Sequence, residues 1–162
     1  MKRRLIAAAL AALTAIAAGC GGGGGGSLPR SLRAPVVRAV DGDTILVRIA
    51  GHSEYVRLIG VDTPETVKPG APVECFGPRA SAYQHRLVEG RVVRLTFDRE
   101  RRDAYGRLLA YVHVGRTFDN AALAARGLAR PLPVAPNTAH AALFARLARR
   151  AAIAGRGLWG KC

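Results

Sequence analysis

The chain has 162 residues, with 25 Lys and Arg against 11 Asp and Glu, and a formal net charge of +14. The roughly 130 residues that follow position 33 are enough for one hydrophobic core and not clearly enough for two. No internal repeat is apparent, so we expect one folded domain. Its basic excess favours polyanionic partners, namely nucleic acid, anionic lipid or acidic wall polymers, and charge alone does not choose among them.

The first 19 residues are typical of a secretory signal peptide. A basic start is followed by an apolar run, 5–18, that is shorter than the ~20 residues needed to cross a bilayer. The next motif, "AAGC" at 17–20, resembles a bacterial lipobox, in which Cys20 would be lipidated, although Ala17 stands where leucine is usual. Cleavage by the ordinary signal peptidase remains the alternative.

The glycine-rich stretch 20–33 then predicts a flexible tether ahead of a domain at 34–162. We expect an exported protein that is anchored to the membrane through Cys20 and faces the periplasm or the cell exterior. If Cys20 is not lipidated, the protein would be secreted.

Three β-rich runs, 36–40, 44–50 and 54–61, predict a three-stranded meander that turns at "GHS". A helix is predicted from Pro78 to Gly90, followed by strands at 91–97 and 108–114. Two more helices are predicted, one ending at Gly127 and one in "NTAHAALFARLARRAA". Segregated strands and helices of this kind indicate an α+β fold, compatible with a five-stranded OB-type barrel with three helices.

Three aspartates are predicted to gather at one end of the first hairpin. With the turn at Gly51 and His52, antiparallel pairing sets Asp43 opposite Gly60 and Asp41 opposite Asp62. Clustered carboxylates repel one another unless a cation lies between them, and hard oxygen ligands favour Ca²⁺ or Mg²⁺ over Zn²⁺. Alone, "DGDT" at 41–44 would be read as a polar turn.

Two arginines and a glutamate extend this cluster. Arg57 precedes Asp62, and Arg107 stands at the start of the strand "LLAYVHV". Two guanidinium forks beside a cation can hold a phosphodiester and neutralise charge that develops during displacement. Glu65 lies just beyond Pro64, where a carboxylate could orient or deprotonate an attacking water.

These motifs together resemble the thermonucleases of the staphylococcal nuclease family. The pieces that carry the resemblance are "DGDT", "VRLIGVDTPE", "FGPRAS", "DAYGRLLAYV", "ARGLAR" and "PNTAH", and they cover nearly all of residues 36–160. The resemblance implies an OB-fold barrel with three helices, one Ca²⁺ ion, and hydrolysis of phosphodiester bonds in DNA and RNA.

The resemblance also implies a role for each matching residue. Calcium would be bound by Asp43, Asp62 and the Thr63 carbonyl, with Asp41 supporting them. The phosphate would be held by Arg57 and Arg107, Glu65 would act on the water, and Tyr105 would contact the nucleotide. The alternative is a non-catalytic nucleic-acid-binding module at the cell surface, an adhesin or a DNA-uptake receptor, which would not require this whole set. We therefore favour the enzyme, acting as a monomer without a protein partner.

The chain departs from its relatives at three positions near the expected substrate path. Staphylococcal nucleases resembling this chain carry a lysine before the loop tyrosine and two tyrosines before "PN", where this chain has Ala104, Leu132 and Val134. Without these groups we expect substrate binding to suffer more than chemistry. The alternative is that "RPLPVAP" takes another path and supplies different contacts.

The cysteines suggest a disulfide. If Cys20 carries the lipid, Cys75 and Cys162 remain as a pair in an oxidising compartment, and we expect them to be bonded.

Overall fold

The computed structural model describes residues 29–66, 70 and 72–162. The predicted signal peptide, the predicted lipidation site at Cys20 and most of the predicted tether lie outside these residues. No helix in the described part of the chain is long and apolar enough to cross a membrane.

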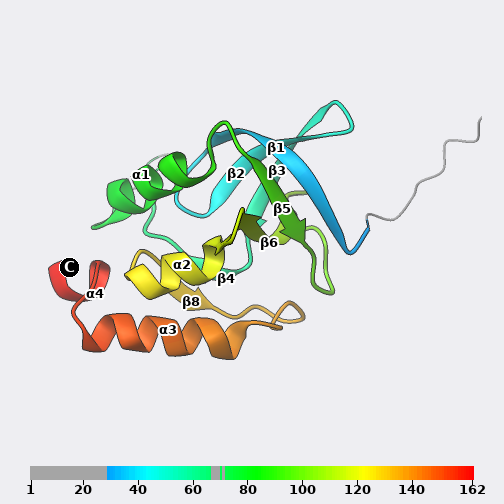
Figure 1. Cartoon of the computed structure of the whole chain (residues 1–162). Coiled ribbons are helices and arrows are strands. Elements are labelled where there is room, and N and C mark those ends of the chain that lie inside the picture. The colour runs from blue at the N-terminus through cyan, green and yellow to red at the C-terminus, as the bar shows by residue number, and fades with distance from the viewer. Residues whose placement is uncertain (1–28, 67–69, 71) are drawn as a thin grey trace, which may run out of the picture.

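The described chain forms eight strands and four helices (Figure 1). The strands are β1 (Ser31–Ala39), β2 (Thr44–Ile49), β3 (His52–Leu58), β4 (Gly60–Asp62), β5 (Val92–Thr96), β6 (Leu108–Val114), β7 (Thr117–Phe118) and β8 (Arg130–Leu132). The helices are α1 (Gly77–Val88), α2 (Asp119–Arg126), α3 (Ala141–Ile153) and the short α4 (Leu158–Lys161).

Five strands close into a barrel. Antiparallel pairs run in the order β3-β2-β1-β5-β6, and a parallel pairing of β3 with β6 joins the two ends of this sheet. The long strand β1 serves both halves, because its first part pairs with β5 and its last part pairs with β2. A register shift between Val36 and Arg38 separates the two parts, as expected where a bulge bends a strand around a barrel. The α+β prediction of a five-stranded OB-type barrel with three principal helices is confirmed.

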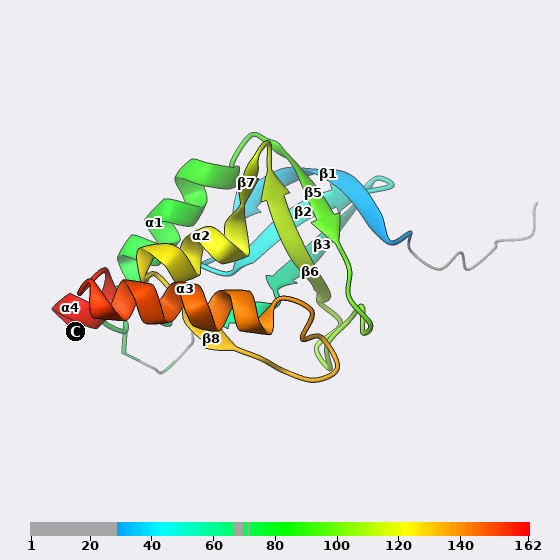
Figure 2. The ribbon, with the colours of Figure 1, turned by 60° about the horizontal axis from the view of Figure 1, so that its bottom comes forward.

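The helices cover one side of the barrel. Figure 1 shows α1 beside the barrel with α3 and α4 farther away, and Figure 2 shows α3 running across α2. Each long helix buries one face: Phe144, Ala148 and Ala151 of α3 are buried, and Leu143 and Leu147 pack partly against the core. The predicted apolar face of this helix is therefore confirmed.

The N-terminal boundary and the first hairpin differ from the sequence prediction. Strand β1 begins at Ser31, inside the stretch expected to be tether, because residues 31–35 pair with β5. The hairpin loop is Ala50-Gly51, both with positive φ, so Thr44 lies opposite Arg57. The predicted pairing of Asp43 with Gly60 is wrong, and so is that of Asp41 with Asp62, since the turn comes one residue earlier than expected.

Candidate active site

The loop "DGDT" and the segment after β4 meet at one edge of the barrel. Asp43 is 5% exposed, and its Oδ2 accepts hydrogen bonds from the Thr63 amide at 2.7 Å and from Thr63 Oγ1 at 2.9 Å. A Cβ on Gly42 would lie 2.7 Å from Thr63 Oγ1, so glycine permits this close approach. The two motifs are thus joined by direct contacts, although they are about 20 residues apart.

Arg57 connects the aspartates. Its Nη1 lies 2.9 Å from Asp43 Oδ1, and its Nη2 lies 2.8 Å from Asp62 Oδ1. The same Nη1 donates to the carbonyl oxygens of Leu58 and Val61, at 3.1 and 2.9 Å. Those carbonyls lie where the chain passes from β3 into β4, so Arg57 also fixes the path that delivers Asp62 to the site.

Asp41 and Asp43 are close enough to affect one another. Asp41 Oδ1 accepts a hydrogen bond of 2.9 Å from the Asp43 amide. Burial raises the pKa of Asp43 to about 6, with Asp41 adding to the rise while Arg57 and Thr63 oppose it. A buried carboxylate in this state is stabilised by additional positive charge. Asp41 therefore lies directly beside Asp43, and the supporting role that the resemblance implies for it stays a prediction.

All of the predicted catalytic and metal-binding residues border one small cavity of about 90 Å³. Its lining comprises Asp41, Asp43, Thr44, Arg57, Asp62, Thr63, Pro64, Glu65 and Arg107. The aspartates are brought together even though the predicted register was wrong, because the chain bends between β3 and β4 and Arg57 spans the two sides of that bend.

The donor atoms around this cavity fit a hard cation. Asp43, Asp62 and Thr63 supply oxygen only, which suits Ca²⁺ or Mg²⁺. Among the described residues, no group of three His, Cys, Asp or Glu side chains is arranged to hold a metal unaided. Ca²⁺ accepts six to eight oxygen ligands, so water and substrate would have to complete the shell. Arg57 bridges Asp43 and Asp62 here, and a cation would take over part of its role in balancing their charge.

Arg107 is held by a residue that the sequence interpretation missed. Asp103 Oδ2 accepts a hydrogen bond of 2.7 Å from Arg107 Nε, and Asp103 Oδ1 accepts one of 2.9 Å from the Arg107 amide. Burial acts to raise the pKa of Asp103, but the bonds from Arg107 outweigh it and lower that pKa. The i, i+4 spacing of Asp103 and Arg107 in "DAYGR" was the available signal. Asp103 thereby orients one of the two expected phosphate-binding groups.

A second cavity of about 350 Å³ adjoins the first, since Arg57 and Arg107 line both. The Arg107 guanidinium lies 5.5 Å from the centre of the Tyr105 ring, and Tyr105 is 86% exposed. The other lining residues include Ala104, Leu132, Val134 and Asn137. The three positions at which the sequence departs from the pattern that the family resemblance implies, Ala104, Leu132 and Val134, therefore lie together beside the arginine pair.

Asn137 is another residue to which the sequence interpretation assigned no role. Its Oδ1 accepts from the Glu100 amide and its Nδ2 donates to the Glu100 carbonyl, both at 2.8 Å. These two bonds join the segment after β8 to the segment after β5 and form one wall of the larger cavity. The "PNTAH" motif marked the residue, but only the fold shows which segment it ties down.

Comparisons with known proteins agree with this geometry. Residues 55–161 match the family described as "Staphylococcal nuclease homologue". The chain is 44% identical to a thermonuclease of Staphylococcus intermedius over 124 residues, which cover 76% of this chain and 74% of the relative. It is 41% identical to a thermonuclease of Staphylococcus hyicus, with 76% and 73% covered.

A third relative is longer than the match. Endonuclease YncB of Bacillus subtilis (strain 168) is 42% identical over 126 residues, which cover 76% of this chain but only 60% of that protein. The family match spans the end of β3, strands β4 to β8 and all four helices. The chain belongs to the staphylococcal nuclease homologue family.

Proposed function

We propose that this protein is a Ca²⁺-dependent nuclease that hydrolyses phosphodiester bonds of DNA and RNA. The observation that carries the proposal is the 90 Å³ cavity, in which three aspartates, two arginines and one glutamate converge. Besides the aspartates that pair with Arg57, this cavity is lined by a second arginine and by a glutamate, which a phosphate and a water molecule could contact. The names of the relatives, thermonuclease and endonuclease, support the same reaction class.

The two arginines have complementary positions for binding a phosphate. Arg57 approaches from the end of β3 and Arg107 from the start of β6, two strands that pair side by side in parallel. Each guanidinium presents a planar set of donors that fits two phosphate oxygens. When a phosphate binds, Arg57 would exchange a carboxylate partner for a phosphate oxygen, while Asp103 would keep Arg107 in position. Charge that builds on the phosphate would then be neutralised from two directions.

Glu65 is proposed to activate the attacking water. It follows Pro64 on the rim of the cavity, and its Oε1 accepts a hydrogen bond of 2.8 Å from the Thr66 amide. A carboxylate fixed in this way can accept a proton from a water positioned in line with the phosphate. A bound Ca²⁺, held by Asp43, Asp62 and the Thr63 carbonyl, would supply positive charge for the phosphate and the water.

Degradation of single-stranded DNA tests the function. Hydrolysis should require Ca²⁺ and stop with chelator, and Glu65→Gln should lower turnover by about two to four orders of magnitude while DNA binding persists. Glu54→Gln is a matched control, because Glu54 pairs with Arg102 on the barrel and does not line the cavity. Full activity in chelator would refute the metal assignment, and full activity of Glu65→Gln would refute the base.

The same substrate assay separates the enzyme from the alternative binding module. An adhesin or uptake receptor built on this barrel would retain DNA without cutting it, with or without Ca²⁺. The presence of the complete charged set around one cavity favours the enzyme.

We also propose that the protein is exported and tethered to the membrane through a lipid on Cys20. The support is the sequence pattern of residues 1–20 and the glycine-rich stretch that follows it. Cys20→Ser should move the protein from the membrane fraction to the soluble exported fraction without changing its specific activity. Membrane retention of that variant would refute the lipid anchor.

A further inference from the structure

A third opening, of about 490 Å³, lies between α1, the end of α2 and the C-terminal segment. Four cationic side chains line it, together with two aromatic rings and two glycines: Arg79, Arg86, Arg126, Lys161, Phe76, Tyr83, Gly155 and Gly157. It contains no acidic lining residue. It also shares no lining residue with the two cavities described above. The opening is therefore a separate basic surface.

The cations on this surface are available to an anion. Among the described residues, none of the four is within salt-bridge distance of a carboxylate. Arg79 lies 5.2 Å from the centre of the Phe76 ring, and Arg126 lies 5.1 Å from the centre of the Tyr83 ring. Both rings are half-buried while both arginines are exposed. Each arginine thus lies over an aromatic ring and remains exposed to solvent.

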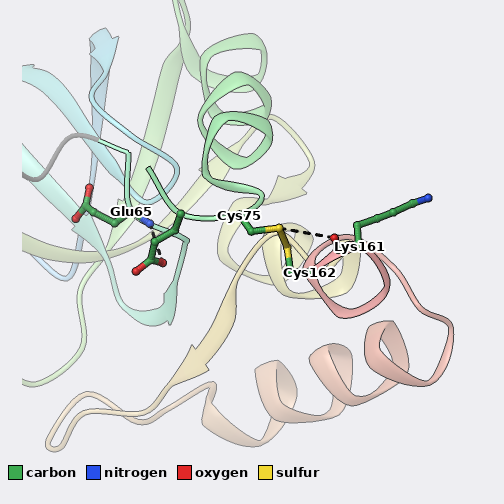
Figure 3. The surroundings of a disulfide bond; sticks show 5 residues. Glu65, Cys75, Lys161 and Cys162 are labelled. Atoms are coloured by element: carbon green, nitrogen blue, oxygen red, sulfur yellow. Dashed lines mark hydrogen bonds between the residues drawn. A yellow bond between two sulfur atoms is a disulfide. The ribbon is translucent and has the colours of Figure 1, made fainter. Parts of the chain in front are cut away.

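The C-terminal segment is fastened against this opening. The Leu158 amide donates to the Gly127 carbonyl at 2.9 Å, and the sulfur atoms of Cys75 and Cys162 lie 2.07 Å apart, at disulfide distance. Figure 3 shows this bond beside Lys161, whose side chain extends away from it. The cation of Lys161 is therefore carried on a segment tied at both ends to the rest of the domain.

The opening begins close to the candidate active site. Glu74 Oε2 accepts from the Glu65 amide at 3.2 Å, and the Glu74 amide donates to the Glu65 carbonyl at 2.9 Å. Cys75 and Phe76 follow directly, and consecutive Cα atoms are about 3.8 Å apart, so Phe76 is within about 8 Å of Glu74 along the chain. Figure 3 shows Glu65 and Cys75 on neighbouring stretches of chain. A strand leaving the catalytic cavity could reach this surface within a few nucleotides.

We infer that this opening is a second contact site for single-stranded nucleic acid, at which Arg79, Arg86, Arg126 and Lys161 hold phosphates and the rings of Phe76 and Tyr83 accept bases. The inference rests on the proposed nuclease function and adds a site outside the catalytic cavity. Charge complementarity carries it, because four cations without an acid line one opening. The aromatic rings favour nucleic acid over a membrane headgroup, since single strands are bound by stacking on such rings as well as by cations.

Binding of fluorescent oligothymidylates in chelator, with Glu65→Gln as the parent protein, tests the site. Probes of about 4 and about 16 nucleotides span the range of single-strand site sizes. Adding Arg79→Ala and Arg86→Ala should weaken binding of the longer probe by about 5- to 20-fold and reduce the magnitude of its salt-dependence slope by about 1.4, at about 0.7 for each lost phosphate contact. The shorter probe can bind at the candidate active site without covering the basic surface, so its binding should weaken by less than about twofold.

The matched control removes the same charge from α3. Arg146 and Arg149 are exposed and line none of the three cavities, so Arg146→Ala with Arg149→Ala should change long-probe binding by less than about twofold. Equal losses in the two double variants would overturn the site and leave only a diffuse charge effect. Unchanged binding of the Arg79 and Arg86 variant would also overturn it.

Vesicle binding and DNA cleavage distinguish a lipid-binding surface and a failure of the proposed function from the inferred site. If the Arg79 and Arg86 variant loses binding to anionic phosphatidylglycerol vesicles but keeps its long-probe affinity, the surface faces lipid and the inference is wrong. Failure of the proposed function is seen separately, as absence of DNA cleavage by the unmodified protein with Ca²⁺. Length-dependent loss of probe binding does not depend on cleavage, because it is measured in chelator.

Discussion

Gln84 of α1 donates a hydrogen bond of 2.8 Å to Asp119 Oδ2 at the start of α2, and both side chains are fully buried. Asp119 Oδ1 and Gln84 Oε1 have no hydrogen-bond partner within the described chain. Two buried acceptors without donors are costly as long as the carboxylate is charged. A proton on Asp119 would resolve both at once, because the acid would donate to the amide oxygen while the amide donates to the acid.

This pairing makes the stability of the domain dependent on pH. Burial raises the pKa of Asp119 to about 7 from 3.8, and the bond from Gln84 only partly opposes that rise. The folded state therefore holds a proton that the unfolded state releases above pH ~4. Folding stability should fall as pH rises from about 4 to about 7 and then level off. Tyr83 stays neutral across this range, because burial and Asp119 raise its pKa.

Asp119→Asn should remove this dependence. Its amide can pair reciprocally with Gln84 and carries no charge to bury, so we expect a gain of about 1–3 kcal/mol in unfolding free energy at pH 8. Below pH 4 the gain should vanish. The measurement is urea unfolding of the unmodified protein and of Asp119→Asn at pH 4 to 8, in chelator. Subtracting one unfolding free energy from the other at each pH cancels the contribution of Asp43, whose pKa is also raised. If the unfolding free energies of the two proteins change in parallel with pH, the prediction is wrong, and the α2 N-terminus keeps Asp119 charged.

Local patterns in the sequence predicted the elements better than the contacts between them. Helices α1, α2 and α3 and the strands 92–96 and 108–114 follow from periodicity, Pro78 and the glycines. The register of the first hairpin was not predicted from the sequence. It depends on a turn at Ala50, which has a positive φ, and alanine in a sequence does not indicate such a conformation. The Gln84–Asp119 pair was also missed, since a polar residue on a helix face is usually solvated and nothing local shows that two such faces meet.

For the site, the motifs identified the residues and the fold supplied their partners. Each predicted catalytic or metal-binding side chain lines one cavity, yet the bridge that Arg57 forms between Asp43 and Asp62 depends on the bend between β3 and β4. That bend lies within a run, 54–61, that reads as one continuous strand. The bend is set by tertiary packing, and the local sequence pattern does not indicate it.

Substituting lysine for Arg57 and, separately, for Arg107 should separate a role in stability from a role in catalysis. Arg57 contacts two carboxylates and two backbone carbonyls, whereas the ion pair of Arg107 is with Asp103 of its own loop. Both variants should lower kcat/KM by about 10²- to 10³-fold, because a lysine lacks the planar fork. Only Arg57→Lys should also lower the unfolding free energy, by about 1–3 kcal/mol. Equal thermal unfolding of the two variants would contradict the bridging role.

Removing the link between Cys75 and Cys162 should destabilise the domain. The two positions are 87 residues apart, so in the chain-entropy model the disulfide contributes about 4 to 5 kcal/mol. Cys75→Ser with Cys162→Ser should unfold at lower urea concentration than the oxidised protein and should match the reduced wild-type protein. If oxidised and reduced protein unfold at the same midpoint, or if purified protein has two free thiols, the bond does not form.

The second cavity predicts weak substrate binding with near-normal chemistry. Ala104, Leu132 and Val134 line it beside Arg107. These are the positions at which the resemblance to staphylococcal nucleases implies a lysine and two tyrosines. Each absent aromatic contact can cost about 1–3 kcal/mol in single-strand binding, while the cavity that contains Glu65 and both arginines is complete. We therefore expect a high KM, a kcat little affected by these positions, and steep salt dependence because long-range charge replaces local contacts.

Restoring the missing groups tests this directly. Leu132 is 42% exposed and Val134 is 59% exposed, so tyrosines at both positions can be accommodated at the surface, as can a lysine at Ala104. The triple variant should lower KM by about tenfold or more, leave kcat within about twofold, and tighten binding of a 3′,5′-bisphosphate mononucleotide. A matched control places tyrosine at Val37, which is 44% exposed on β1 and lines none of the three cavities. If KM and salt dependence stay unchanged in the triple variant, substrate does not cross this surface, and the prolines of 131–136 direct the strand along another path.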